Sequence, residues 1–110
     1  MRIEIKALTF DAIIGLLEHE RTTPQRVIVD AAFEYDFRGE FIDYADAAER
    51  IKAVMIKAEF ELIEEALLTL KNRLKAAYPS IETLTLKISK PDILPDCEVS
   101  VSDRYKFKEN

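Results

Sequence analysis

The sequence predicts an α+β domain in which a four-stranded antiparallel sheet carries two helices on one face. Two segments with an apolar residue at every second position precede residue 38, and two more follow residue 80. Between them, the apolar spacing changes to the three-and-four pattern of amphipathic helices. The element order is therefore β-β-α-α-β-β, which is typical of the α+β class. With 110 residues and 48% hydrophobic content, we expect a single domain over residues 1–110 with one core.

The first predicted strand covers residues 2–14 and contains a bulge. Its apolar positions include Ile3 and Ile5, and the parity then changes to Leu8 and Phe10. One extra residue near Ala7 would return both halves to the same face of the sheet. The second strand alternates regularly from Val27 to Phe37, with polar residues on its other face.

A charged loop joins these strands and includes Glu18, His19, Glu20 and Arg21. Gly15 precedes it and can adopt backbone conformations that other residues avoid. Such loops are most often solvated turns, so the charges alone predict no site. One histidine and one cysteine cannot build a His-rich zinc site, so we expect no metal here.

Two helices are predicted between residues 44 and 78. Asp43 is placed as the N-cap of the first, with Asp46 in its first turn. No Gly or Pro interrupts the apolar stripe, but a single helix of this length would be unusual for such a domain. We therefore expect a break near residues 59–61, and Pro79 ends the second helix.

The C-terminal segment predicts a hairpin. Leu84, Leu86 and Ile88 share one face of its first strand, and Cys97 and Val99 begin the return strand. Cys97 is therefore expected to be a buried structural thiol. Lys90 has the parity of Ile88, so it is buried if the strand continues and solvated if the strand has ended. The spacing does not decide between these alternatives.

The charge distribution and hydropathy exclude some partners. The net charge is -5 and no block of Lys or Arg occurs, so we expect no nucleic-acid partner. No apolar run approaches the roughly 20 residues that span a bilayer, so we expect no membrane partner either. Residues 2–5 alternate like a strand instead of forming a signal peptide, which favours the cytoplasm. Open sheet edges favour closure by oligomerisation.

Four short motifs follow one another on the expected elements. They are Gly15, Glu20 and Gln25 at five-residue intervals, Asp43-Tyr44, Phe60-Glu61-Leu62-Ile63-Glu64, and Lys87-Ile88-Ser89-Lys90-Pro91. Together they resemble the dihydroneopterin aldolase family over nearly the whole chain.

The resemblance implies the tunnelling fold, in which subunits join their sheets into an oligomeric barrel as a homo-tetramer or homo-octamer. It also implies a lyase of folate biosynthesis that binds a small-molecule pterin and cleaves dihydroneopterin to hydroxymethyl-dihydropterin and glycolaldehyde. The dihydropterin carries a ring imine that can accept the electrons of the broken bond. The implied retro-aldol reaction is therefore acid–base chemistry without a metal or other cofactor.

The resemblance further implies two groups of site residues. The catalytic group is Lys90, Glu20 and Tyr44, with Tyr44 contributed by the neighbouring subunit, and the substrate-binding group is Glu64, Ile63, Leu62 and Gln25. Glu64 would anchor the pterin, because a carboxylate can accept both hydrogen bonds from an amino group beside a ring N–H.

Two other functions remain open from the sequence. One is a dihydroneopterin or dihydroneopterin triphosphate epimerase of the same superfamily, although no Gly-rich phosphate cradle is visible. The other is a non-catalytic oligomeric module. The connection at residues 38–42 is shorter than the family pattern, and residues 92–98 lack its usual glycine.

Overall fold

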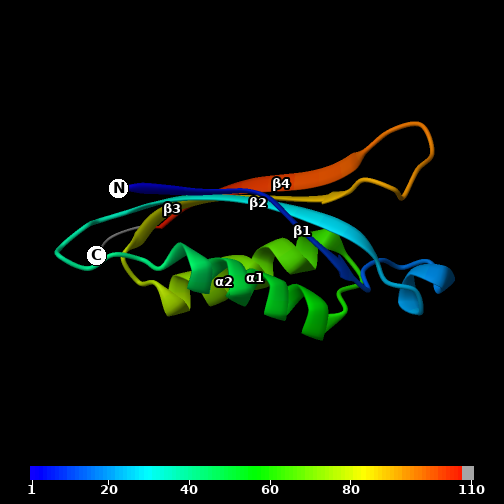
Figure 1. Cartoon of the computed structure of the whole chain (residues 1–110), viewed down its shortest axis with the longest axis horizontal. Coiled ribbons are helices and arrows are strands. Elements are labelled where there is room, and N and C mark those ends of the chain that lie inside the picture. Colours follow the sequence, from blue (N-terminus) through cyan, green and yellow to red (C-terminus); the bar gives the residue numbers. More distant parts are fainter. Residues whose placement is uncertain (108–110) are drawn as a thin grey trace.

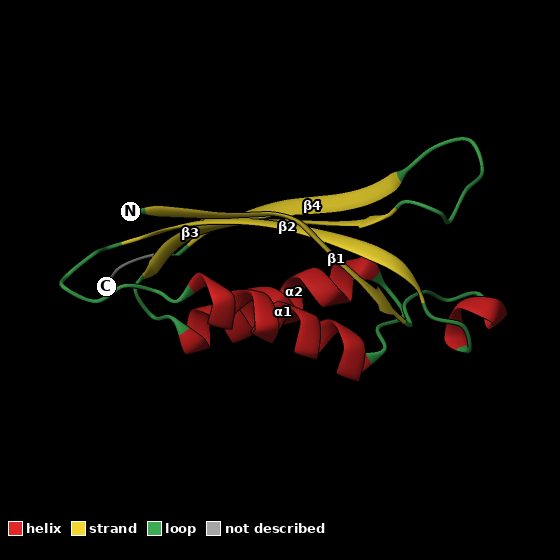
Figure 2. Ribbon diagram, in the orientation of Figure 1, coloured by secondary structure: helices red, strands yellow, loops and turns green. Residues whose placement is uncertain are grey.

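The computed structural model describes residues 1–107 and contains one four-stranded sheet and two α-helices. The elements in chain order are β1 (Arg2–Ala12), the 3-10 helix η1 (Glu18–Arg21), β2 (Gln25–Tyr35), α1 (Tyr44–Ala58), α2 (Ile63–Ala77), β3 (Ile81–Lys90) and β4 (Val99–Lys106). The strands lie in the order β1-β2-β3-β4, and each neighbouring pair is antiparallel. Both helices pack against the same face of the sheet (Figure 1 and Figure 2). The predicted α+β architecture is confirmed.

The predicted bulge in β1 is confirmed. The pairing with β2 shifts register between Ile5 and Leu8, and Ala7 has a φ of 57°. The Ala7 amide donates a hydrogen bond of 2.8 Å to Asp30 Oδ1 on β2. The extra residue is therefore held by a side chain, and both halves of β1 keep their apolar residues on the helix side. The strand ends at Ala12, two residues before the predicted end.

The helix boundaries also agree with the sequence. The Asp43 carboxylate accepts hydrogen bonds from the amides of Ala45 and Asp46, as expected of an N-cap. The predicted break is present, because α1 ends at Ala58 and Glu59 adopts the left-handed conformation with a φ of 49°. Within the described residues, neither helix is both long and apolar enough to span a bilayer.

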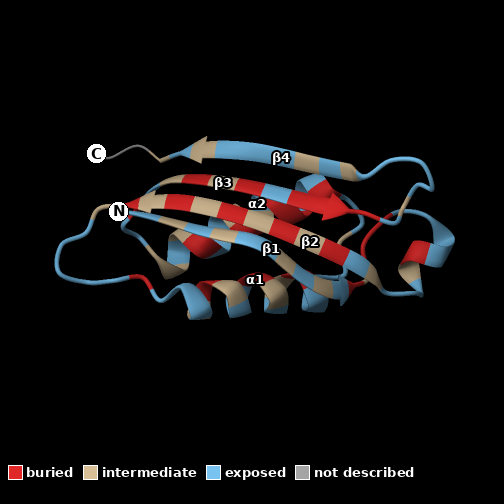
Figure 3. Ribbon diagram, turned by 45° about the horizontal axis from the view of Figure 1, so that its top comes forward, coloured by how far each residue is buried: buried red, intermediate tan, exposed pale blue. Residues whose placement is uncertain are grey.

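The core lies between the sheet and the helices. The residues at 2% exposure or less come from all layers of the domain and include Ile14, Val27, Val29, Phe33, Ile51, Met55, Leu70, Leu74, Leu84, Leu86 and Ile88. Figure 3 shows the resulting alternation of buried and more exposed residues along β2 and β3. The opposite face of the sheet is polar and includes Asp30, Thr85 and Lys87 around a shallow hollow of about 320 Å³.

Two details of the predicted strands were wrong. Phe37 lies beyond the end of β2 and is 39% exposed, with its ring 4.6 Å from that of Phe41. Cys97 is an exposed free thiol and not a buried one. The β3–β4 ladder begins with the pair Lys90 and Val99, so Cys97 belongs to the hairpin loop. Strand parity does not decide which way a loop side chain points.

Candidate active site

Lys90 is the last residue of β3 and is buried. The strand continues to Lys90, which pairs with Val99 and is 8% exposed. The structure therefore selects the buried alternative that the sequence left open. An ammonium group removed from water needs a compensating charge or hydrogen bonds, because burying an unpaired charge is very unfavourable.

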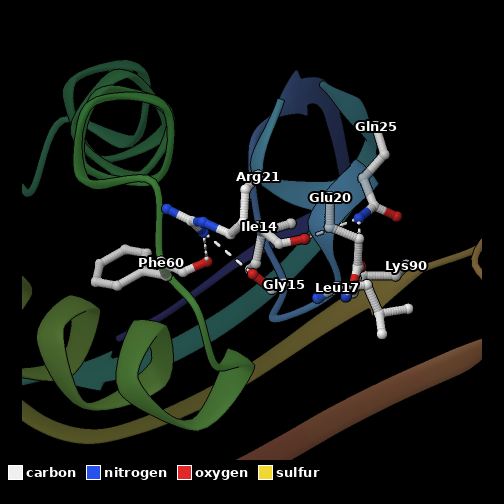
Figure 4. A network of polar contacts seen from close by, with 8 residues as sticks. All are labelled: Ile14, Gly15, Leu17, Glu20, Arg21, Gln25, Phe60 and Lys90. Atoms are coloured by element: carbon white, nitrogen blue, oxygen red, sulfur yellow. Dashed lines mark hydrogen bonds and ion pairs between the residues drawn. The ribbon is translucent and has the colours of Figure 1, made fainter. Parts of the chain in front are cut away.

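That compensation comes from Glu20 on η1. Glu20 is 4% exposed, and its Oε2 accepts a hydrogen bond of 2.5 Å from Lys90 Nζ. The Nε2 group of Gln25 donates to the same oxygen at 2.9 Å and to the Ile14 carbonyl at 2.8 Å. The Leu17 amide donates to Glu20 Oε1 at 3.3 Å. Figure 4 shows the Glu20 and Gln25 side chains converging with Lys90 in this network.

The network determines the protonation of Glu20. Burial acts to raise the pKa of this carboxyl, but the hydrogen bonds from Lys90, Gln25 and the Leu17 amide outweigh it. The pKa is lowered from the ordinary value of 4.5. Near neutral pH, Glu20 is therefore a carboxylate beside the Lys90 amino group. This is a buried donor–acceptor pair suited to proton transfer.

Gly15 makes room for the Glu20 carboxylate. Its φ of +133° lies outside the conformations that other residues adopt readily. A Cβ at this position would lie 2.2 Å from Glu20 Cδ and 2.3 Å from each carboxylate oxygen. The sequence predicted unusual backbone freedom at Gly15, and the structure adds this close approach to a charged side chain.

A second group of predicted residues lies at the start of α2. Leu62 is 40% exposed, Glu64 is exposed in the first turn, and the Ile63 side chain is 7% exposed within the core. The preceding connection is fixed to the charged loop, because the Gly15 amide donates to the Phe60 carbonyl at 3.0 Å. The start of α2 is thereby held next to the loop that carries Glu20.

Tyr44 lies apart from the other predicted residues in the single chain. It is the first residue of α1 and is 68% exposed. Figure 1 shows that α1 begins at the end of the molecule opposite η1. A hollow of about 520 Å³ at the Pro79–Phe107 end is lined by Asp36, Lys75 and Glu82, and it includes none of the predicted site residues.

The sequence assigned no role to Arg21, which the structure places at the centre of the loop contacts. Its guanidinium donates hydrogen bonds to the carbonyls of Gly15, Glu59 and Phe60. Every residue has a backbone carbonyl, so the sequence does not indicate which carbonyls Arg21 binds. Among residues 1–107, no group of three or more His, Cys, Asp and Glu side chains is placed to hold a metal ion.

A family model described as dihydroneopterin aldolase (FolB) matches residues 3–102. No curated protein matches the chain.

The solved structures that share the fold include three described as dihydroneopterin aldolases. A dihydroneopterin aldolase from E. coli, in complex with neopterin, is 23% identical, with a TM-score of 0.85 over 96% of this chain and 98% of that one. A Vibrio cholerae structure described as a dihydroneopterin aldolase is 17% identical, with a TM-score of 0.88 over 97% and 98%. A Burkholderia thailendensis dihydroneopterin aldolase bound to guanine is 17% identical, with a TM-score of 0.79 over 98% and 92%.

Proposed function

The chain belongs to the dihydroneopterin aldolase family, a lyase family of folate biosynthesis, and we propose that Glu20 and Lys90 are its proton-transfer pair. The reaction cleaves dihydroneopterin to hydroxymethyl-dihydropterin and glycolaldehyde. The observation that carries the assignment is the buried contact of 2.5 Å between Lys90 Nζ and Glu20 Oε2. A buried ion pair contributes little net stability compared with apolar residues of similar size. Its presence here is therefore better explained by chemistry that needs both groups.

The cleavage breaks the bond between the first and second carbons of the pterin side chain. The hydroxyl of the second carbon loses its proton and becomes the aldehyde of glycolaldehyde. The bonding electrons move into the ring imine, whose nitrogen gains a proton. The resulting enol-like intermediate is then protonated at the first carbon, while the ring nitrogen releases its proton, which gives the hydroxymethyl product.

Lys90 supplies positive charge and a proton at the ring imine, directly or through a water molecule. Glu20 holds Lys90 in place and can accept a proton from it or from that water. Tyr44 exchanges a proton with the substrate hydroxyl and with the intermediate. These assignments use one group at each position where the substrate gains or loses a proton.

Glu64 anchors the pterin ring through its amino group and the neighbouring ring N–H. The first turn of α2 supports this role, because its backbone amides lack partners within the helix and favour negative charge. The Ile63 side chain lies in the core, so Ile63 contacts the pterin through its backbone. Leu62 covers the ring with its exposed side chain, and Gln25 acts by orienting Glu20.

The site is completed by a neighbouring subunit in a homo-tetramer or homo-octamer. Two observations support this assembly: Tyr44 is exposed at the end of the molecule away from Lys90, and β1 and β4 are the edges of the described sheet. Joining β4 of one chain to β1 of the next would close the sheets into a barrel and pair both edges. We also place the enzyme in the cytoplasm, where a free thiol such as Cys97 stays reduced.

The test is a product assay on the purified protein with dihydroneopterin. Release of glycolaldehyde in equal amount to hydroxymethyl-dihydropterin is expected. A changed side-chain diastereomer without glycolaldehyde would instead show an epimerase, and an unchanged substrate would indicate a non-catalytic module.

A further inference from the structure

We propose that Arg21 is a positioning residue that fixes the Glu20–Lys90 pair relative to the segment carrying Glu64. This inference rests on the proposed function, which assigns the pair to the ring imine and Glu64 to the amino group and ring N–H of the same pterin. Glu20 and Arg21 are consecutive residues of η1, and Figure 4 shows their side chains leaving it in opposite directions. Glu20 reaches Lys90, whereas Arg21 reaches the connection between α1 and α2.

The guanidinium of Arg21 joins three backbone carbonyls. Nη1 donates to Gly15 O at 3.1 Å and to Phe60 O at 3.2 Å, and Nη2 donates to Glu59 O at 2.9 Å. Glu59 is the C-cap of α1, where carbonyl groups lack helical partners and carry partial negative charge, and Phe60 is the next residue. Among the ion pairs of the described residues none involves Arg21. Its guanidinium charge is therefore stabilised by the dipoles of these carbonyl groups.

These bonds connect the two halves of the site. Gly15 contacts the Glu20 carboxylate, and its amide donates to the Phe60 carbonyl of the α1–α2 connection. The Gly15 carbonyl accepts from Arg21, whose Nη1 also donates to Phe60. Phe60 accepts from Gly15 and Arg21 and lies four residues before Glu64. A shift of the connection relative to η1 would therefore move Glu64 relative to Glu20. Lys90 and Glu64 must both meet the same rigid pterin ring, so a small misplacement slows the reaction without abolishing binding of the ring.

The experiment compares Arg21→Ala and Arg21→Lys with the unmodified enzyme. In the Arg21→Ala variant, kcat for cleavage should fall about 10²-fold, which is the effect of a misplacement of about 1 Å. The Kd for pterin, which lacks the reacting side chain, should change only slightly. Guanidinium ions should restore part of the lost kcat by binding between the three carbonyls, and potassium ions at the same concentration should not. Arg21→Lys should also be slow, because an ammonium group does not reproduce the planar fork.

The matched control is Arg50→Ala. Arg50 also links segments, since it donates to Asp46 Oδ2 at 2.8 Å and lies over the Tyr78 ring, but it is outside the proposed site. This control should lower stability and leave kcat unchanged.

An unchanged kcat in both Arg21 variants would overturn the inference. So would equal losses of kcat and pterin affinity without guanidinium rescue, because they would indicate a purely structural role. If Arg21→Ala does not fold, Arg21→Lys decides the question in the same way. Absence of cleavage by the unmodified enzyme would refute the proposed function itself, and the inference with it.

Discussion

Gly15→Ala is expected to disable the active site while the fold is retained. The added Cβ would lie 2.3 Å from both carboxylate oxygens of Glu20, against an ordinary contact of at least 3.4 Å. The carboxylate must therefore move by about 1 Å to restore normal contact. A movement of this size breaks the 2.5 Å contact with Lys90. We expect kcat to fall about 10²-fold, because proton transfer requires hydrogen-bonding distance.

Gly39→Ala provides the matched control for backbone strain. Gly39 also has a positive φ, of +90°, but a Cβ there would meet nothing within 4 Å. Each substitution should cost about 1–3 kcal/mol of stability from the unfavourable backbone conformation. Only Gly15→Ala adds the clash with Glu20.

The assay is steady-state release of glycolaldehyde from dihydroneopterin, with denaturant unfolding of each variant measured in parallel. Gly39→Ala should keep the kcat of the unmodified enzyme per folded site. Full turnover by folded Gly15→Ala would refute the conclusion that the close approach to Glu20 is needed for catalysis. Equal losses of kcat in the two variants would assign the effect to backbone strain.

Three further predictions concern the proposed roles. Glu64→Ala should weaken pterin binding by about 2–5 kcal/mol and Glu64→Gln by less, since the amide keeps one acceptor; an unchanged Kd in Glu64→Ala would remove Glu64 from the site. Because the pKa of Glu20 is lowered in the folded state, the ionised carboxylate stabilises the fold fully above pH 4.5. This stabilisation is lost as the pH falls through the pKa of Glu20 in the folded protein. Glu20→Gln should thus lower the free energy of unfolding by up to about 3 kcal/mol at pH 7 and by progressively less below pH 4.5. Denaturant titrations at fixed protein concentration measure this loss, and a loss independent of pH would contradict the prediction. Homo-oligomers of Tyr44→Phe and of Lys90→Ala should be nearly inactive, and refolding them together should restore about one site in four if the two residues come from neighbouring chains. No recovery in oligomers shown to be mixed would contradict a shared site.

The sequence predicted most of the fold because the apolar spacing of each element is regular. The change of parity after Ile5 was sufficient to locate the bulge, since period-two alternation leaves no other way to keep one face apolar. The position of Cys97 was not predictable in this way, because the end of a ladder depends on where the partner strand stops.

The candidate site was only partly predictable. The resemblance indicated Glu20 and Lys90 as catalytic residues. The burial of Lys90, however, depends on β3 continuing as far as Lys90 and on η1 folding over it. Arg21 was not predictable, because it acts on backbone carbonyls that the fold alone brings to it. A pair of complementary side chains can be suspected from the residue types, whereas a hydrogen bond from a side chain to a backbone carbonyl cannot.

The most direct test of the account is the rate of dihydroneopterin cleavage by Lys90→Met in a single turnover. Methionine keeps the length of the side chain and removes the charge and the exchangeable protons. Lys87→Met is the matched control, because Lys87 lies on the same strand and is exposed. Lys90→Met should still bind pterin but cleave about 10²–10⁴-fold more slowly, and Lys87→Met should cleave normally. Cleavage at the unmodified rate by folded Lys90→Met would contradict the assignment of the Glu20–Lys90 pair.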